Sequence, residues 1–299
     1  MKMKTNKALL STIGVILIAG ILIFGVSGDS KDKLLHEGTA MYFPNAVDFA
    51  GETAPLQITD VKERLDRELL INANLHATTV LIIKRANRAF PVIEPILQKY
   101  SIPDDFKYLA VIESGLTNAV SGAGAKGVWQ FMPDTAKEKG MEVNDIVDER
   151  YHLEKATEAA CKYLLSAKEK FGSWTLAAAS YNGGMTGVGK KIEEQKVSNY
   201  YDLALTEETS RYVFRILALK EIMRNPAKYG FSIFSSDLYS QIPSKKIEID
   251  SSINDLADFA KTQGINYKIL KIHNPWLRDK KLLNPTNKKY EIEIPLSGY

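Results

Sequence analysis

The chain has 299 residues, of which 45% are hydrophobic and 25% charged, and this suits one sizeable folded domain plus a smaller module. The formal net charge of +3 is small and no basic stripe interleaves with aromatic residues, which excludes a typical nucleic-acid-binding protein. The lone cysteine, Cys161, excludes an internal disulfide framework and lies in a helical pattern that favours a buried core residue.

The first 27 residues predict a targeting or anchoring segment. Lys2, Lys4 and Lys7 precede an apolar run from about residue 8 to residue 26, an order that directs the following chain out of the cytoplasm. The run is long for a signal-peptide core and barely long enough to span a bilayer. A cleaved signal peptide and a retained membrane anchor therefore both stay open.

Helical periodicity dominates the middle of the chain. Asp60 is expected to cap the first helix, and Pro91 to divide the long apolar pattern after it into two helices. Pro103 and the two acids that follow it predict the start of another helix. That helix carries Glu113 near its end, and Gly115 is a suitable stop.

Further helical patterns follow, and then the pattern changes. Asp134 is expected to cap a short helix, the Gly183-Gly184 pair to end another, and Pro226 to stop the last. The tail reads differently, because KKIEID and YEIEIP alternate as short strands around two short helical patterns. We therefore predict a mainly α protein with a small C-terminal α+β (βααβ) module. The expected parts are 1–27 signal peptide or membrane anchor, 28–59 linker, 60–230 helical domain, 231–244 linker and 245–299 βααβ module.

Glu113 is the candidate catalytic residue. It lies near the negative end of a helix and follows an apolar run, so both the helix dipole and desolvation should raise its pKa. A carboxyl that is protonated near neutral pH can give its proton to a leaving oxygen. Taken by itself, the residue is better explained as an exposed glutamate on an amphipathic helix.

Small residues crowd the stretch after Glu113. Ser121, Gly127 and two glycines between them would let a bulky substrate approach the backbone, although a flexible loop has the same composition. The stretch runs directly into VWQFMP, where Gln130 offers an amide. We expect the aromatic residues of this string to pack in the core and Met132 to form a cleft wall.

Two more pairs complete the candidate site. Tyr181 and Asn182 stand at a helix end, where they fit either a sugar-binding pair or a core tyrosine with a capping amide. Glu208 and Tyr212 are four residues apart on one helix face, where a solvated surface pair is the default interpretation. The four histidines are scattered, so no metal site is predicted.

Together these motifs resemble the lytic transglycosylases with a lysozyme-like soluble-transglycosylase domain, most of all the membrane-bound lytic murein transglycosylase D type. The resemblance runs from about residue 89 to residue 224. Its ordered motifs are the ES…S-x-x-GA-x-G-x-WQFMP-x-TA string from Glu113 to Ala136, VDER from Val147 to Arg150, YN-x-G from Tyr181 to Gly184 and ET-x-x-YV from Glu208 to Val213. Ser180 replaces the usual alanine before the Tyr-Asn pair.

The tail resembles a LysM module, a peptidoglycan-binding unit. Its Asn274-Pro275 pair and closing IEIP fit that pattern, whereas Ser251-Ser252-Ile253 replaces the usual Gly-Asp-Thr entry. That departure bears on glycan binding by the module rather than on its fold.

The resemblance implies cleavage of the β-1,4 bond between N-acetylmuramic acid and N-acetylglucosamine in peptidoglycan, leaving 1,6-anhydro ends. Glu113 would act first as an acid and then as a base, and no cofactor is implied. It also implies an exported protein of the bacterial periplasm or cell envelope. Residues implied to line or support the cleft are Ser121, Gly127, Gln130, Met132, Tyr181, Asn182, Glu208 and Tyr212. The alternatives are a goose-type lysozyme reaction on the same fold and a non-catalytic wall-binding protein.

Overall fold

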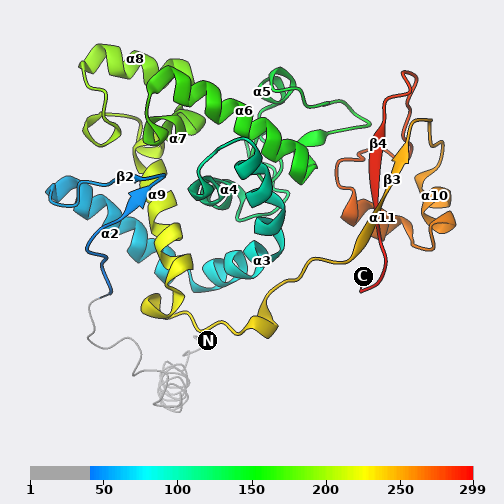
Figure 1. The fold of residues 1–299 in the computed structure, drawn as a ribbon, viewed down its shortest axis with the longest axis horizontal. Helices are drawn as coiled ribbons and strands as arrows, with labels where there is room; N and C mark the ends of the chain where they lie inside the picture. The colour runs from blue at the N-terminus through cyan, green and yellow to red at the C-terminus, as the bar shows by residue number, and fades with distance from the viewer. Residues whose placement is uncertain (1–40, 299) are drawn as a thin grey trace, which may run out of the picture. The chain divides into compact units, whose positions relative to one another are not determined.

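The structure is a computed structural model that describes residues 41–298 (Figure 1). The predicted targeting segment at residues 1–27 lies outside these described residues. The chain divides into two compact units, and of the first, residues 1–41, only Met41 is described. None of the helices between residues 41 and 298 combines the length and apolarity that a bilayer crossing requires. The compact unit that begins at Tyr42 holds all the elements described below.

The fold is mainly α, as predicted from the sequence. Its larger helices are α2 (Thr59–Asn74), α3 (His76–Lys99), α4 (Lys107–Ser114), α5 (Pro133–Glu138), α6 (Leu153–Phe171), α7 (Trp174–Gly183), α8 (Met185–Gln195), α9 (Glu207–Arg224), α10 (Leu256–Thr262) and α11 (Tyr267–His273). Short 3-10 turns connect them: η2 (Asp104–Phe106), η3 (Glu149–Tyr151), η4 (Tyr200–Asp202), η5 (Pro226–Tyr229) and η6 (Ser235–Asp237). The strands are β1 (Asp48–Phe49), β2 (Glu52–Thr53), β3 (Ser244–Ile249) and β4 (Tyr290–Pro295).

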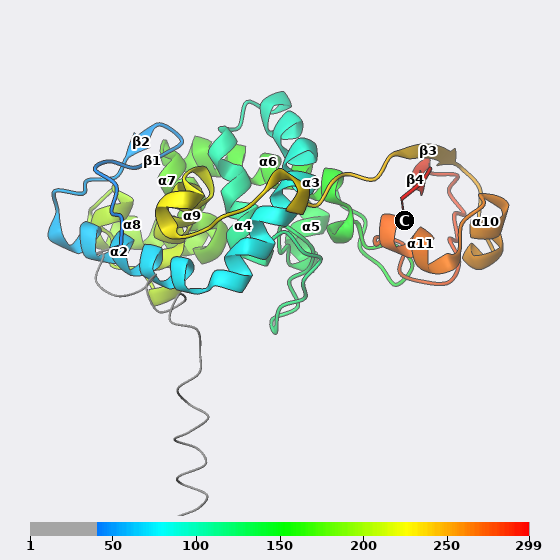
Figure 2. The same cartoon turned by 90° about the horizontal axis from the view of Figure 1, so that it is seen from below.

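Helix α4 lies inside the helical domain, with α3, α6, α7 and α9 around it (Figures 1 and 2). Its residues from Lys107 to Ile112 are all buried, and α9 packs directly against it. A helix that is covered on every side must be largely apolar, and KYLAVIES meets that demand from Tyr108 to Ile112, while Lys107 at its start pairs with Glu94 and Asp104. The end of α4 is therefore held by the core rather than by a loop.

Two helix boundaries differ from the sequence prediction. Helix α3 runs unbroken through Pro91 and Pro95, and the break falls earlier, at Leu75. Each proline removes one backbone donor, but burial of Ala89, Ile93 and Leu97 along one face keeps the helix in place. Asp60 lies in the first turn of α2 and does not cap it.

The prediction that Asp134 caps a helix was also wrong. The N-cap position of α5 is Met132, with Pro133 at the first helical position and Asp134 in the first turn. Proline is well suited to that position because its missing N–H would have had no partner there.

A small hairpin of β1 and β2 was not predicted from the sequence at all. Glu52 of β2 accepts hydrogen bonds from the backbone N–H groups of Trp174 and Thr175 at the start of α7.

The C-terminal module has the predicted β-α-α-β order. Strands β3 and β4 pair antiparallel, with Ser244 opposite Pro295 and Ile249 opposite Tyr290. Helices α10 and α11 lie between the strands in sequence and are both capped at their N-termini, by Asp255 and Asn266 respectively.

Candidate active site

The Glu113 carboxylate stands where the buried helix α4 reaches the domain surface. The helix stops where Gly115 takes the left-handed conformation, with a φ of 58°, and its N–H donates to the Val111 carbonyl. Glu113 itself is half-buried. The Glu113 side chain is thus fixed by the core on one side and accessible on the other.

Glu113 meets a tyrosine of α9. Tyr212 donates a hydrogen bond from its hydroxyl to Oε1 of Glu113, and its side chain is only 1% exposed. Burial raises the pKa of the Glu113 carboxyl to about 7, and the Tyr212 hydrogen bond and the charge of Arg215 act against that rise. The raised pKa expected from the sequence is confirmed. Such a carboxyl can both give and take a proton at neutral pH.

Helix α9 also brings two charged side chains near Glu113. Arg215 donates from its guanidinium to the Ile112 carbonyl at 2.9 Å and opposes the rise in the Glu113 pKa. Glu208 is exposed in the first turn of α9, and its negative charge adds to that rise. Glu208 and Tyr212 were predicted from the sequence as site residues, whereas Arg215 was not. Its signal was its place three residues after Tyr212, on the same helix face.

Tyr181 and Asn182, near the end of α7, are tied to neighbouring elements. The Tyr181 hydroxyl donates to the Trp129 carbonyl at 2.8 Å, and burial raises its pKa well above the ordinary value, so it stays a donor. Asn182 donates from Nδ2 to Glu208 Oε1 at 3.0 Å and accepts from the Thr209 hydroxyl at 2.8 Å. Asn182 therefore joins α7 to α9, and the cap of α7 is Gly184.

Residues 119–131 form a turn-rich loop beside the end of α4. Ser121 accepts at Oγ from the Ala125 N–H at 3.0 Å, which closes a tight turn. Gln130 takes a left-handed backbone conformation and donates from Nε2 to the carbonyls of Ala119 at 3.0 Å and Gly127 at 2.7 Å. These two predicted site residues thus make intramolecular bonds that shape the loop.

Arg150 braces this loop from the η3 turn. Its Nε and Nη2 each donate to Asp148 at 2.8 Å, and both side chains are almost fully buried. Nη1 donates to the Gly124 and Phe131 carbonyls, each at 3.2 Å. Arg150 thus pairs with Asp148 inside the VDER motif, and its role in holding the loop was not predicted from the sequence.

Gly127 owes its identity to the same contact. A Cβ atom on Gly127 would lie 1.8 Å from the Arg150 carbonyl oxygen, and its φ of 81° is left-handed. The glycine was expected to let substrate approach the backbone. In the structure, its small size lets the Arg150 backbone approach.

The aromatic string after Gly127 divides as expected. Trp129 is fully buried and donates from Nε1 to the Thr157 hydroxyl at 2.8 Å. Phe131 is also buried and meets the Tyr181 ring edge-on, with 5.8 Å between ring centroids. Met132 is 43% exposed, and its place in a cleft wall stays a prediction. Cys161 is buried, as predicted for a core residue.

A cavity of about 540 Å³ opens beside the Glu113 cluster. Glu208 and Arg215 line it, although Glu113 itself does not. The other lining residues come from α2, α9 and the connection after α2: Glu68, Ile71, Asn72, Leu75, Glu207 and Arg211.

Between residues 41 and 298, no group of histidine, cysteine, aspartate or glutamate side chains is placed to hold a metal ion.

Two family models match the chain. Residues 91–203 match the transglycosylase SLT domain, and residues 245–298 match the soluble lytic transglycosylase C-terminal LysM-like domain. The resemblance seen in the sequence motifs is therefore confirmed, because one family model matches the region of the motifs and the other matches the tail. Glu113, the loop and the Tyr181-Asn182 pair lie inside the first match, whereas Glu208 and Tyr212 follow it.

The chain is also similar to membrane-bound lytic murein transglycosylase D from two strains of Escherichia coli. In each case 28% of residues are identical over 235 residues, which cover 76% of this chain and 50% of the relative. The chain thus spans about half the length of the curated relatives it matches.

Proposed function

We propose that this protein is a lytic transglycosylase that cleaves the β-1,4 bond between N-acetylmuramic acid and N-acetylglucosamine in peptidoglycan and leaves 1,6-anhydro ends. The SLT match and the lytic murein transglycosylase relatives support the enzyme class. The observation that carries the mechanism is Glu113, a carboxyl with a pKa of about 7 at the end of a buried helix.

The reaction needs one carboxyl that works twice. Protonated Glu113 gives its proton to the bridging oxygen as the bond from that oxygen to C1 breaks, and the acetamide of the muramyl sugar stabilises the positive charge at C1. The C6 hydroxyl of the same sugar then attacks C1 and returns its proton to Glu113. No water is consumed, and the intramolecular hydroxyl has a proximity advantage over water.

The other residues support this carboxyl. Tyr212 fixes Oε1, Arg215 holds the end of α4, and the braced loop presents the exposed side chain of Met132 to the substrate. Ser121, Gln130, Tyr181 and Asn182 act mainly by holding the loop and α7 in position.

Hydrolysis is the second candidate, because Glu208 supplies a negative charge near Glu113 from an exposed position that water can reach. Inverting glycoside hydrolases use a second carboxylate to direct the attacking water. The masses of fragments released from purified peptidoglycan separate the two reactions. Our proposal predicts anhydro ends, which lack one water relative to the reducing ends that hydrolysis makes.

Replacing Tyr212 by phenylalanine should shift the pH dependence of cleavage upward. The Tyr212 hydroxyl stabilises ionised Glu113, so its loss raises the Glu113 pKa and keeps the carboxyl protonated to higher pH. We expect the alkaline limb of the rate profile to move up by about 1 pH unit. The control is Tyr163→Phe, whose hydroxyl bonds the Ser180 carbonyl instead. Superimposable profiles for wild type and Tyr212→Phe would remove Tyr212 from the acid's environment.

The same proposal includes a location in the bacterial cell envelope, since the relatives are named as membrane-bound murein enzymes. Residues 1–27 would act as signal peptide or membrane anchor, residues 60–230 as the catalytic domain and residues 245–299 as the LysM-like module, with linkers at 28–59 and 231–244. Peptidoglycan glycan strands are the proposed substrate, and the membrane is a partner only if the N-terminal segment is retained.

A further inference from the structure

The LysM-like module shares its core with a segment of the helical domain. Val147 and Tyr151 are buried among the apolar side chains of the module, including Leu277. Val147 and Leu277 form an antiparallel bridge, the Asp148 N–H donates to the Trp276 carbonyl at 2.9 Å, and the Arg278 N–H donates to the Ile146 carbonyl at 2.7 Å. Figures 1 and 2 both show the green connection between α5 and α6 reaching alongside the module.

Charged and aromatic contacts flank this shared core. Lys288 of the module binds Glu142 at 2.6 Å and Glu149 at 3.2 Å, and the Tyr290 hydroxyl donates to Glu142 at 2.9 Å. The Glu149 side chain is 3% exposed, so Lys288 neutralises a carboxylate that has little access to water. Trp276 stacks between His152 on one side and Tyr290 on the other.

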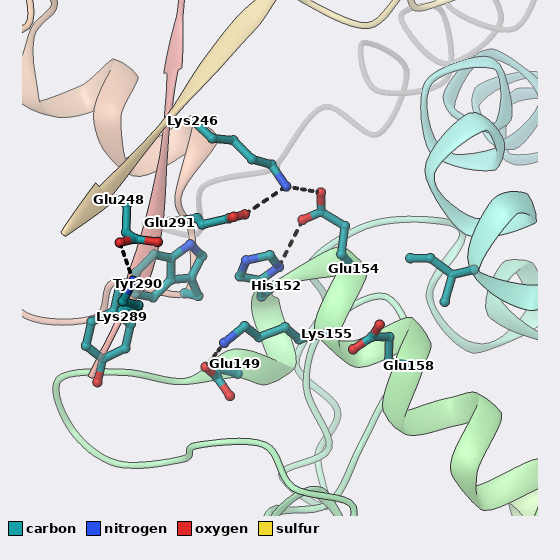
Figure 3. Close-up of a pocket in the computed structure, with 12 residues that line it drawn as sticks. Glu149, His152, Glu154, Lys155, Glu158, Lys246, Glu248, Lys289, Tyr290 and Glu291 are labelled. Atoms are coloured by element: carbon teal, nitrogen blue, oxygen red, sulfur yellow. Dashed lines mark hydrogen bonds and ion pairs between the residues drawn. The ribbon is translucent and has the colours of Figure 1, made fainter. Parts of the chain in front are cut away.

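A cavity of about 440 Å³ lies along the same boundary (Figure 3). Its walls are densely charged, but the charges pair with each other. Lys246 contacts both Glu154 at 2.9 Å and Glu291 at 3.2 Å, and Lys155 contacts Glu149 at 2.5 Å. Since these acids and lysines already have partners, the cavity is better explained as a seam between two docked parts than as a ligand site.

The docked segment leads straight to the active-site loop. The Asp148 N–H donates to the Trp276 carbonyl of the module, and both Asp148 carboxylate oxygens accept hydrogen bonds from the Arg150 guanidinium. Arg150 in turn holds the carbonyls of Gly124 and Phe131, on two sides of the loop. A continuous chain of contacts thus runs from Trp276 and Lys288 to the loop beside Glu113.

We propose that the LysM-like module is a positioning element of the catalytic domain, which holds the 119–131 loop in place by docking on residues 142–151. The module's surface at Trp276 and Lys288 is then occupied by its own chain rather than by glycan. The kinetic part of this inference rests on the proposed function, whereas its structural part does not.

A charge reversal at the seam tests the structural part in the full chain. Lys288→Glu places a third carboxylate against Glu142 and Glu149, whereas the matched control Lys289→Glu faces only Glu248 of the module's own strand. We expect amide hydrogens of the loop, such as those of Lys126 and Phe131, to exchange about tenfold faster in Lys288→Glu and to be unchanged in the control. Far-UV circular dichroism should show both variants folded.

Cleavage of soluble glycan strands tests the kinetic part, because such substrates need no binding to intact wall. We expect Lys288→Glu to raise KM about fivefold with a smaller fall in kcat, the control to stay within twofold, and Glu142→Lys to restore part of the loss when combined with Lys288→Glu. Equal loop exchange in the two single variants would overturn the inference. If wild type forms no anhydro product, the proposed function fails, but the exchange result still decides the inference.

Discussion

Glu113→Gln should abolish the release of anhydro fragments, with a loss of at least about 10²–10⁴-fold in rate. The amide keeps the shape of the side chain and can still accept the Tyr212 hydrogen bond, but its N–H protons are too weakly acidic to be transferred. Because the same group acts in both steps, neither bond cleavage nor attack by the C6 hydroxyl can proceed without it. The measurement is the initial rate of soluble fragment release from purified peptidoglycan at pH 7.

The matched control for this variant is Glu193→Gln, an exposed residue of α8 that does not line the cavity beside Glu113. It removes a surface carboxylate and should keep wild-type rates. Wild-type turnover by Glu113→Gln would remove Glu113 from the mechanism.

Stability gives an independent check that Glu113→Gln is folded. The folded-state pKa of Glu113 is raised from 4.5 to about 7, so the folded protein binds more protons than the unfolded chain between those values. Wild-type stability should therefore fall as the pH rises from about 4.5 to about 7, by up to about 3 kcal/mol. The variant lacks this loss and should unfold at higher urea concentration than wild type at pH 8, but not at pH 4.

Gly127→Ala should destabilise the helical domain strongly. The new methyl group would meet the Arg150 carbonyl at 1.8 Å in a left-handed backbone conformation, so either the loop or the VDER turn must move. We expect a loss of about 3–5 kcal/mol in the free energy of unfolding. Thermal unfolding should show the transition about 2–4 °C lower for each kcal/mol lost.

Gly124→Ala separates the cost of backbone strain at Gly127 from the cost of the clash with the Arg150 carbonyl. Gly124 also has a positive φ, of 90°, but a Cβ atom there would have open space around it. Its substitution should cost only the backbone strain, about 1–2 kcal/mol. If both alanine variants unfold at the same temperature, the close approach of the Arg150 backbone is not the reason that position 127 requires a glycine.

Much of the fold followed from periodicity and end signals. The helical stretches that carry Glu113, Tyr181 and Tyr212 were placed correctly because apolar spacing and glycine stops are local properties of the sequence. The paired strands of the tail were equally clear from their alternation. Pro91 misled the prediction because burial of one face of α3 outweighed a local helix-breaking signal.

The candidate site was predicted by residue type rather than by contact. Motif resemblance brought together Glu113, Tyr212 and Tyr181, and the structure places all three around the end of α4. What the sequence could not supply were the long-range partners. Arg150 and Arg215 act through backbone carbonyls far away in the chain, and carbonyl groups carry no sequence signal.

The fate of water tests the central claim most directly. Purified protein can be incubated with peptidoglycan in water enriched in oxygen-18, and the released fragments weighed by mass spectrometry. If Glu113 passes its proton between two oxygens of the substrate, the new ends carry no label and lack one water. A labelled oxygen at C1 of every released end would show that water is the nucleophile and would contradict the account.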